Sequence, residues 1–257
     1  MFELLSNLLK DHKGNVIFNC FGIWHILIML LIFGGVITTV LVLNNKNQCT
    51  KDKAINLVIN LVFGLYILDF FLMPFSYGYI DVDKLPFHIC TLMGLMAFMA
   101  RNNKFLSRFT TEFTLLGLIG ALMYISYPSG VADGETFPFS YRVIQTMIYH
   151  GLLVAHGVFA LTFNDIKLEW KKIYRELFVI ILIAGIAIVA NNIYSGELGD
   201  FNWFFVSADP FGLFPENIAP FIMPFIMIIV IFLMDILIYS IYFGIRKYFK
   251  FKTKAEI

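Results

Sequence analysis

The sequence predicts an all-α fold: a polytopic membrane bundle of about seven transmembrane helices, with the N-terminus outside and the C-terminus in the cytoplasm. Two observations predict it. First, 59% of the 257 residues are apolar and only 14% are charged, whereas soluble domains carry roughly 25% charged residues. Second, the charged residues gather in short segments that separate long apolar runs. The net charge of +1 indicates no nucleic-acid partner.

Seven apolar segments account for the predicted spans. A helix needs about 20 residues to cross the hydrocarbon core of a bilayer. The third and fourth segments are shorter, which indicates either a place in the protein interior, where the membrane thins, or one re-entrant helix. Proline at the first position of a helix loses no hydrogen bond, so we expect the third span to begin at Pro86. The predicted spans are residues 22–43, 54–76, 86–100, 113–128, 141–163, 176–194 and 218–245.

The distribution of Lys and Arg predicts the orientation. With the N-terminus outside, the cytoplasmic segments are 44–53, 101–112, 164–175 and 246–257, and they hold 15 of the 19 Lys and Arg residues. Cytoplasmic loops of membrane proteins carry an excess of these residues, and every loop obeys the rule in turn. A six-span topology would break the alternation. The basic residues left outside are Lys10, Lys13, Lys84 and Arg142.

Two further segments have a recognisable character. Residues 2–10 are amphipathic, and we expect them either to lie in the membrane interface or to fray. Residues 195–217 contain no basic residue and mix aromatic side chains with Gly and Pro, which indicates an ordered cap on the outer side. No soluble domain, linker or repeat interrupts the chain, so we interpret residues 1–257 as a single transmembrane domain.

Polar groups inside the spans are the candidates for function, because a charged residue at the centre of a span costs roughly 2.5–3.5 kcal/mol on insertion. At about 1.5 Å of rise per residue, several of them reach the same level in the outer half of the bundle. Two histidines, His25 and His88, lie at its outer rim, and His156 and Asp235 lie deeper. The group in the outer half consists of Asp69, Cys90, Tyr124, His150, Asn191 and Asn192.

Helical spacing narrows the chemistry that these residues can do. His88 and Cys90 are two residues apart and point to opposite faces of a helix, so His150 is the better base for Cys90. A Cys–His pair generates the thiolate needed for covalent acyl chemistry. Asp69 is placed to hold the histidine in one tautomer. His88, or the pair Asn191 and Asn192, is a candidate for stabilising an oxyanion.

Other readings of the same residues stay open. His25 is also typical of a helix-capping residue, Asp69 of a packing contact, and the two asparagines of helix bridges. The histidines and Asp69 lack HxxxH or HxxE spacing, so we predict no metal ion and no cofactor. A disulfide between Cys20 and Cys90 would abolish thiol chemistry. A non-enzymatic transporter or a protein that binds a solute or metal is the main alternative function.

Three motifs carry a family resemblance. They are Leu85-Pro86-Phe87-His88-Ile89-Cys90, Tyr149-His150-Gly151, and Asn191-Asn192-Ile193-Tyr194 followed by Asn202-Trp203-Phe204-Phe205 and Asp209-Pro210. In this order they resemble the YwaF-type bacterial integral membrane proteins. That family is similar to the animal transmembrane protein 164 family of phospholipid acyltransferases, and more distantly to membrane hydrolases that cleave fatty-acid esters with threonine and histidine. Here Thr91 follows Cys90, where the signature has a charged residue.

The resemblance implies a location in the bacterial cell membrane, a phospholipid or fatty-acyl substrate, and catalysis by Cys90 and His150. Together with the spacing, it predicts a membrane-embedded lipid acyltransferase or acyl-ester hydrolase. Catalytic roles are expected for Cys90, His150, His88 and Asp69. Substrate contacts are expected for His25, Tyr124, Asn191 and Asn192. Neither the motifs nor the composition indicates an oligomeric state.

Overall fold

The computed structural model describes residues 16–76, 82–128, 130–132, 136–194, 201–210 and 212–255. All of the regular secondary structure in these residues is helical, which confirms the predicted all-α fold. The chain divides into two compact units, Met1–Ile166 and Lys167–Ile257, and each is described by itself below. The amphipathic segment 2–10 lies outside the described residues, as does part of the predicted outer cap, residues 195–200 and 211.

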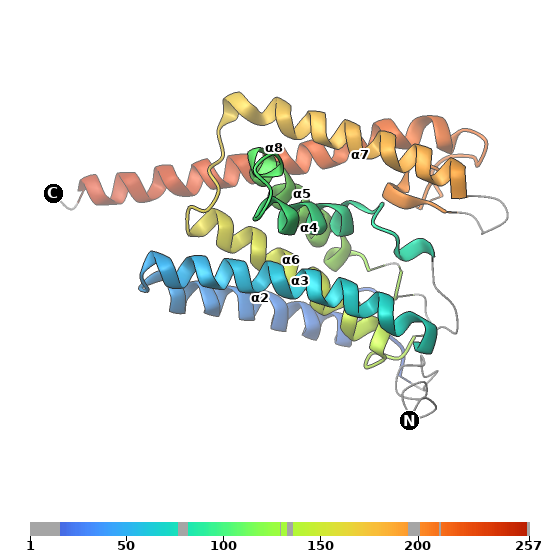
Figure 1. Cartoon of the computed structure of the whole chain (residues 1–257), viewed down its shortest axis with the longest axis horizontal. Helices are drawn as coiled ribbons and strands as arrows, with labels where there is room; N and C mark the ends of the chain where they lie inside the picture. The colour runs from blue at the N-terminus through green and yellow to red at the C-terminus, as the bar shows by residue number, and fades with distance from the viewer. Residues whose placement is uncertain are drawn as a thin grey trace. The chain divides into compact units, whose positions relative to one another are not determined.

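The described residues contain seven α-helices, which correspond to the seven predicted spans (Figure 1). The first unit contains five of them, with two short 3₁₀ turns: α2 (Ile23–Asn44), α3 (Gln48–Ser76), η1 (Val82–Lys84), α4 (Ile89–Ala100), η2 (Leu106–Phe109), α5 (Thr110–Ser126) and α6 (Tyr141–Thr162). The second unit contains η3 (Trp170–Lys172), α7 (Ile173–Tyr194), η4 (Trp203–Phe205) and α8 (Ala219–Ala255).

Six of these helices are long and apolar enough to cross a membrane, so the chain is a multi-pass membrane protein. The exception is α4, whose 12 residues reach only about 18 Å at 1.5 Å per residue. The expectation that a helix begins at Pro86 is wrong, because α4 begins at Ile89. The amide of Phe87 instead donates to the carbonyl of Leu85 at 2.8 Å, and this tight turn interrupts any helix through Pro86.

The first unit is built around α6. Of the spans in this unit, α6 is the most buried and α2 the most exposed. Most of the exposed side chains of α2 are large and apolar, as expected for a helix that faces lipid. Gly157 allows α5 to approach α6 closely, since a Cβ at this position would lie 2.6 Å from the Cβ of Leu118. The polar residues that α6 carries are therefore held inside the unit.

An ion pair fixes the level of α4 relative to α6. Arg101, which caps the C-terminal end of α4, forms a two-pronged pair with Asp165, three residues after α6 ends, at 2.9 and 3.2 Å. Cys90 lies eleven residues before Arg101, so it lies about 16 Å above this end. The first turn of α4 therefore lies near the middle of α6. The non-helical residues 85–88 connect η1 to this turn.

Candidate active site

Cys90 is the second residue of α4 and is buried, with 8% of its surface exposed. The first amide of this helix to donate a hydrogen bond within the backbone is that of Leu92, which bonds to the carbonyl of His88 at 2.9 Å. The amides of the first turn of a helix have no partner within the helix and attract negative charge. The amides of Cys90 and Thr91 act on the Cys90 thiol itself. A thiolate or oxyanion at this position would be stabilised by them.

His150 lies on α6 with one ring nitrogen paired and the other unpaired. Its Nδ1 lies 2.8 Å from the carbonyl oxygen of Thr146. A carbonyl only accepts, so Nδ1 carries the proton and Nε2 carries the lone pair. This Nε2 is buried and has no hydrogen-bond partner. The side chain thus presents an unprotonated nitrogen in the interior, which is the state required of a general base.

The ring of Tyr124 fixes the plane of the His150 imidazole. The two rings are stacked, with centroids 4.0 Å apart and planes 8° from parallel. Tyr149 contacts the same imidazole edge-on at 5.3 Å. With the Thr146 carbonyl on Nδ1, these contacts define the orientation of Nε2.

The structure brings Cys90 and His150 to the same level of the first unit. The hydroxyl of Tyr149 donates to the carbonyl of Cys90 at 3.4 Å. On α5, Gly120 contacts the backbone of Cys90, and Tyr124, one turn further along, stacks on His150. One helical turn is about 6 Å. Three predicted site residues, Cys90, Tyr124 and His150, therefore gather around α5.

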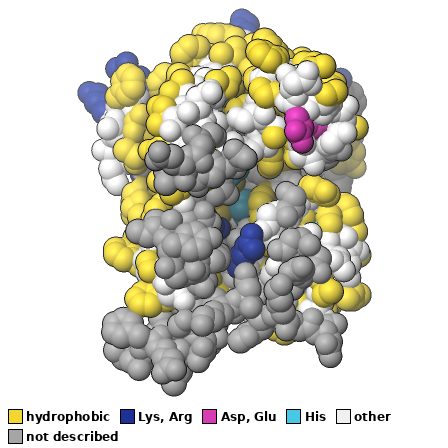
Figure 2. Space-filling view, turned by 90° about the vertical axis from the view of Figure 1, so that its right-hand side faces the viewer, with side chains coloured by type: hydrophobic (Ala, Val, Ile, Leu, Met, Phe, Trp, Pro, Cys, Tyr) yellow, Lys and Arg dark blue, Asp and Glu magenta, His cyan; other side chains and the backbone are white. Residues whose placement is uncertain are grey.

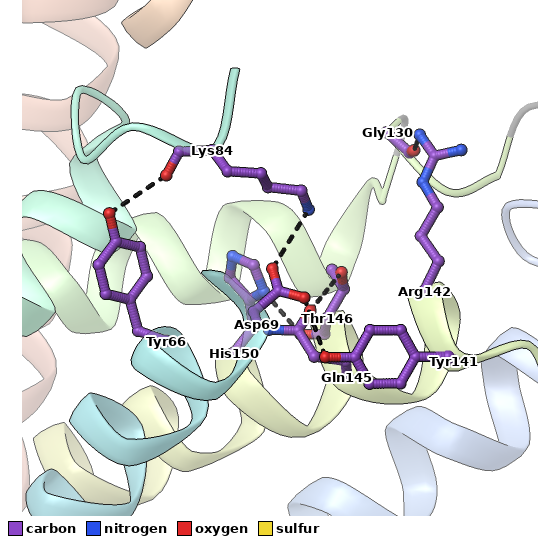
Figure 3. Close-up of polar contacts among 9 residues, drawn as sticks. All are labelled: Tyr66, Asp69, Lys84, Gly130, Tyr141, Arg142, Gln145, Thr146 and His150. Carbon is purple, nitrogen blue, oxygen red and sulfur yellow. Dashed lines mark hydrogen bonds and ion pairs between the residues drawn. The ribbon is translucent and has the colours of Figure 1, made fainter. Parts of the chain in front are cut away.

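Asp69 lies in the same unit, where it contacts the side chains of Tyr141 and Lys84 (Figure 3). The carboxylate accepts a hydrogen bond from the hydroxyl of Tyr141 at 3.0 Å, and its second oxygen lies 3.9 Å from the ammonium nitrogen of Lys84. The sequence indicated that Asp69 would hold the tautomer of His150, but the partner of Nδ1 is the carbonyl of Thr146.

Lys84 is a site residue that sequence reasoning missed, because it was assigned to an outer loop. Its ammonium group acts electrostatically on both Cys90 and His150. The hydroxyl of Tyr66 donates to its backbone carbonyl at 3.2 Å, which anchors η1 to α3. Figure 2 shows basic and histidine side chains near the centre of the face at which α3 ends. The feature of the sequence that could have identified Lys84 is its position directly before the motif that contains Cys90.

His88 and Thr91, which lie close to Cys90 in the sequence, have different environments. His88 caps α4 with an extended backbone, half-buried, and acts electrostatically on His150. The hydroxyl of Thr91 donates to the carbonyl of His88 at 3.0 Å. The threonine is thus engaged with the backbone.

His25, a predicted substrate contact, has both ring nitrogens in hydrogen bonds to the backbone. The amide of Phe21 donates to Nδ1 at 2.9 Å, and Nε2 lies 2.7 Å from the carbonyl of Ile125. The side chain is fully buried. In this arrangement His25 joins the start of α2 to the end of α5 and presents no ring nitrogen to a ligand.

The two asparagines lie in the second unit. The side chain of Asn191 bonds to the backbone of Trp203 twice, donating to its carbonyl at 3.1 Å and accepting from its amide at 2.9 Å. Asn192 is exposed and donates to the carbonyl of Ile188 one turn earlier at 2.8 Å. Asn191 thus joins α7 to η4, within the described part of the predicted outer cap.

The remaining alternatives concern thiols and metal ions. Cys20, Cys49 and Cys90 are all free thiols, so no disulfide joins Cys20 to Cys90. Within the described ranges, no three His, Cys, Asp or Glu side chains are grouped so that they could hold a metal ion.

Comparison with known proteins agrees with the predicted resemblance. A model of the TMEM164 family matches residues 20–242, a range that includes α2 to α7 and most of α8. No curated protein and no solved structure matches the chain. The match extends over far more than half of the sequence and includes both Cys90 and His150. The chain therefore belongs to the TMEM164 family.

Proposed function

We propose that the protein is a membrane-embedded lipid acyltransferase or acyl-ester hydrolase, in which Cys90 is the nucleophile and His150 the base. The observation that carries the proposal is the buried, unpartnered Nε2 of His150, with the first turn of α4 at the same level. Nucleophilic acyl chemistry requires a thiol and a base with a free lone pair, and the first unit supplies both in its interior. Membership of the TMEM164 family supports the membrane location.

The first half-reaction transfers the acyl group to the protein. Nε2 of His150 takes the proton of the Cys90 thiol, and the thiolate sulfur attacks the carbonyl carbon of the acyl ester. Negative charge develops on the carbonyl oxygen, where the amides of the first turn of α4 would stabilise it. The ester C–O bond then breaks, the leaving alkoxide takes the proton from His150, and a lysolipid departs from a thioester at Cys90.

The second half-reaction restores the thiol. A hydroxyl group of a second lipid, or water, gives its proton to Nε2 of His150 and attacks the thioester carbonyl. The C–S bond breaks, and the Cys90 sulfur takes the proton back from the imidazolium. Transfer to a lipid hydroxyl makes the protein an acyltransferase, and transfer to water makes it a hydrolase.

The other predicted residues take supporting roles. Tyr124 and the Thr146 carbonyl orient His150, and His88 lies at the capping position beside the oxyanion site. We assign positioning roles within the fold to His25, Asn191 and Asn192. The protein would act in a bacterial cell membrane, with the N-terminus outside and the site reached from the outer half of the bilayer.

Intact mass spectrometry of protein incubated with phospholipid tests the proposal. We expect the wild type to carry a fatty-acyl mass that neutral hydroxylamine removes, since hydroxylamine cleaves thioesters. Cys90→Ala should carry no such mass. His150→Ala should acquire it about a hundredfold or more slowly, the range that loss of a general base costs.

The other two thiols provide matched controls. Cys20→Ala and Cys49→Ala should be acylated as the wild type is. If acylation instead followed Cys49, which is exposed, it would be adventitious. If Cys90→Ala and the wild type were equally unlabelled while lipid turnover continued in both, the proposal would be wrong. A chain with no lipid turnover at all would favour the alternative of a non-enzymatic transporter or solute-binding protein.

A further inference from the structure

The depth of Cys90 places a demand on any glycerophospholipid that reacts there. Cys90 is buried, and α4 holds it about 16 Å from the Arg101 end, close to the middle of α6. In a glycerophospholipid only the glycerol carbons separate the acyl ester from the phosphate. An ester that reaches Cys90 therefore draws its phosphate below the membrane surface. A buried anion is costly unless a cation pairs with it.

Lys84 is the cation at the right place. Its ammonium nitrogen lies 3.9 Å from a carboxylate oxygen of Asp69 and its side chain keeps 28% of its surface exposed. Figure 3 shows both residues in one close-up with His150. We propose that Lys84 binds the phosphate of the phospholipid substrate and makes the site selective for phosphate-bearing lipids over neutral glycerides. This inference rests on the proposed function for its substrate, and it assigns a binding residue that the acyl chemistry does not use.

Within the part of the chain that the structure describes, the polar contacts of Lys84 leave its ammonium group able to bind an anion. An ammonium group has three donors. Among the described residues its polar partner is Asp69, at 3.9 Å, whereas a charge-assisted hydrogen bond is about 2.7–2.9 Å long. Asp69 therefore balances the charge of Lys84 without occupying the donors. A phosphate oxygen can approach Lys84 at hydrogen-bonding distance while Asp69 stays bonded to Tyr141.

The backbone around Lys84 is held in place, which limits the entropy that binding would cost. The hydroxyl of Tyr66 donates to the Lys84 carbonyl, and Asp69 lies one turn further along α3. Two arginines of the first unit have polar partners of their own. Arg142 donates to the carbonyl of Gly130, and Arg101 is paired with Asp165.

Equilibrium lipid binding by the full-length protein in neutral micelles tests the inference. The probes are phosphatidylglycerol, phosphatidylcholine and diacylglycerol with the same acyl chains, with occupancy measured by native mass spectrometry. We expect the wild type to bind both phospholipids at least about tenfold more tightly than diacylglycerol, as one charge-assisted hydrogen bond would give. Lys84→Gln should remove this difference without changing diacylglycerol binding.

Two variants separate charge from folding. Lys84→Arg keeps the charge and should retain most of the preference for phospholipids. Arg142→Gln removes a basic residue from the same end of the unit and should keep the full preference. Inorganic phosphate at millimolar concentration should not displace phosphatidylglycerol, because the acyl chains contribute most of the affinity. Displacement would mean that the site binds soluble phosphate rather than a lipid, and it would overturn the inference.

The outcomes for Lys84 and for Cys90 can be told apart. If Lys84→Gln retains the phospholipid preference, or if the wild type has none, the inference is wrong even where Cys90 forms a thioester. If the preference is present and depends on Lys84 but no thioester forms at Cys90, the phosphate site stands and the proposed acyl chemistry fails. In the acyl-transfer assay, Lys84→Gln should lower kcat/KM for phospholipid about tenfold more than kcat/KM for diacylglycerol.

Discussion

The histidines of the first unit show how one residue type can serve either structure or chemistry. His25 has backbone partners on both ring nitrogens, so its lone pair and its proton are both used. His150 has a backbone partner on one nitrogen only, and its Nε2 is buried without a partner. An unsatisfied buried polar atom costs about 1–3 kcal/mol, so the fold gives up stability at His150 and retains it at His25.

Replacing His25 with Phe tests this distinction. The ring volume is kept, but the carbonyl of Ile125 and the amide of Phe21 lose their buried partners. We expect the free energy of unfolding to fall by about 2 kcal/mol, measured as a loss of thermal stability in detergent. Thioester formation per folded molecule should not change. A variant of normal stability that no longer binds lipid would instead give His25 the substrate contact that the sequence indicated.

The sequence could identify reactive side chains but not their partners. Polar residues are rare in apolar segments, so Cys90, His150 and Asp69 stand out in a single sequence. The group that holds the tautomer of His150 is a backbone carbonyl, which no residue type reveals. Lys84 was not singled out because the contacts of its ammonium group depend on how the non-helical segment before α4 enters the bundle, and hydropathy does not report this.

At the scale of helices, a glycine sets the distance between α4 and α5. A Cβ on Gly120 would lie 2.7 Å from Cγ2 of Ile89 and 3.2 Å from the amide nitrogen of Cys90. These atoms belong to the first turn of α4. The absence of a side chain at position 120 therefore determines where the thiol lies.

Gly120→Ala should separate the two helices at the site. We expect a modest loss of stability, about 1–3 kcal/mol for overpacking, and a rate of thioester formation lower by about tenfold to a hundredfold. Gly117→Ala is the matched control, since its Cβ would meet nothing closer than the Cβ of Met93 at 3.5 Å. Equal rates in the two variants would show that the α4–α5 distance does not position Cys90.

Hydropathy predicted which segments form helices, but it predicted the ends of those helices less well. All seven predicted spans contain a helix, because an apolar segment of this length must satisfy its own backbone hydrogen bonds in lipid. The start of α4 was misplaced by three residues because the turn at Leu85–Phe87 competes with the helix-starting tendency of Pro86. Because of this shift, Cys90 lies in the first turn of α4, where the backbone amides have no carbonyl partner within the helix.

Across the whole molecule, the asymmetric placement of Lys and Arg remains the basis for the predicted orientation. Two native thiols are well placed to test it. Cys49 is exposed and lies in the predicted cytoplasmic segment 44–53, and Cys20 lies just before α2 on the predicted outer side.

A membrane-impermeant maleimide applied to intact cells should label Cys20 and not Cys49 in a Cys90→Ala background. Burial raises the pKa of the Cys20 thiol, so less thiolate is present at neutral pH and its labelling should speed up as the pH rises. Inverted vesicles should show the opposite pattern, with Cys49 labelled. Labelling of Cys49 in intact cells would reverse the proposed topology.

The shortness of α4 has a consequence for the surrounding lipid. In a flat bilayer of ordinary thickness, about 30 Å of hydrocarbon, the esters of a phospholipid stay near the interface, well above the first turn of α4. Local thinning of the bilayer around the first unit would shorten the path of an ester to Cys90. The reaction rate would then depend on bilayer thickness and be faster in membranes of short-chain lipids, so the physical state of the membrane would regulate the protein without any regulatory ligand.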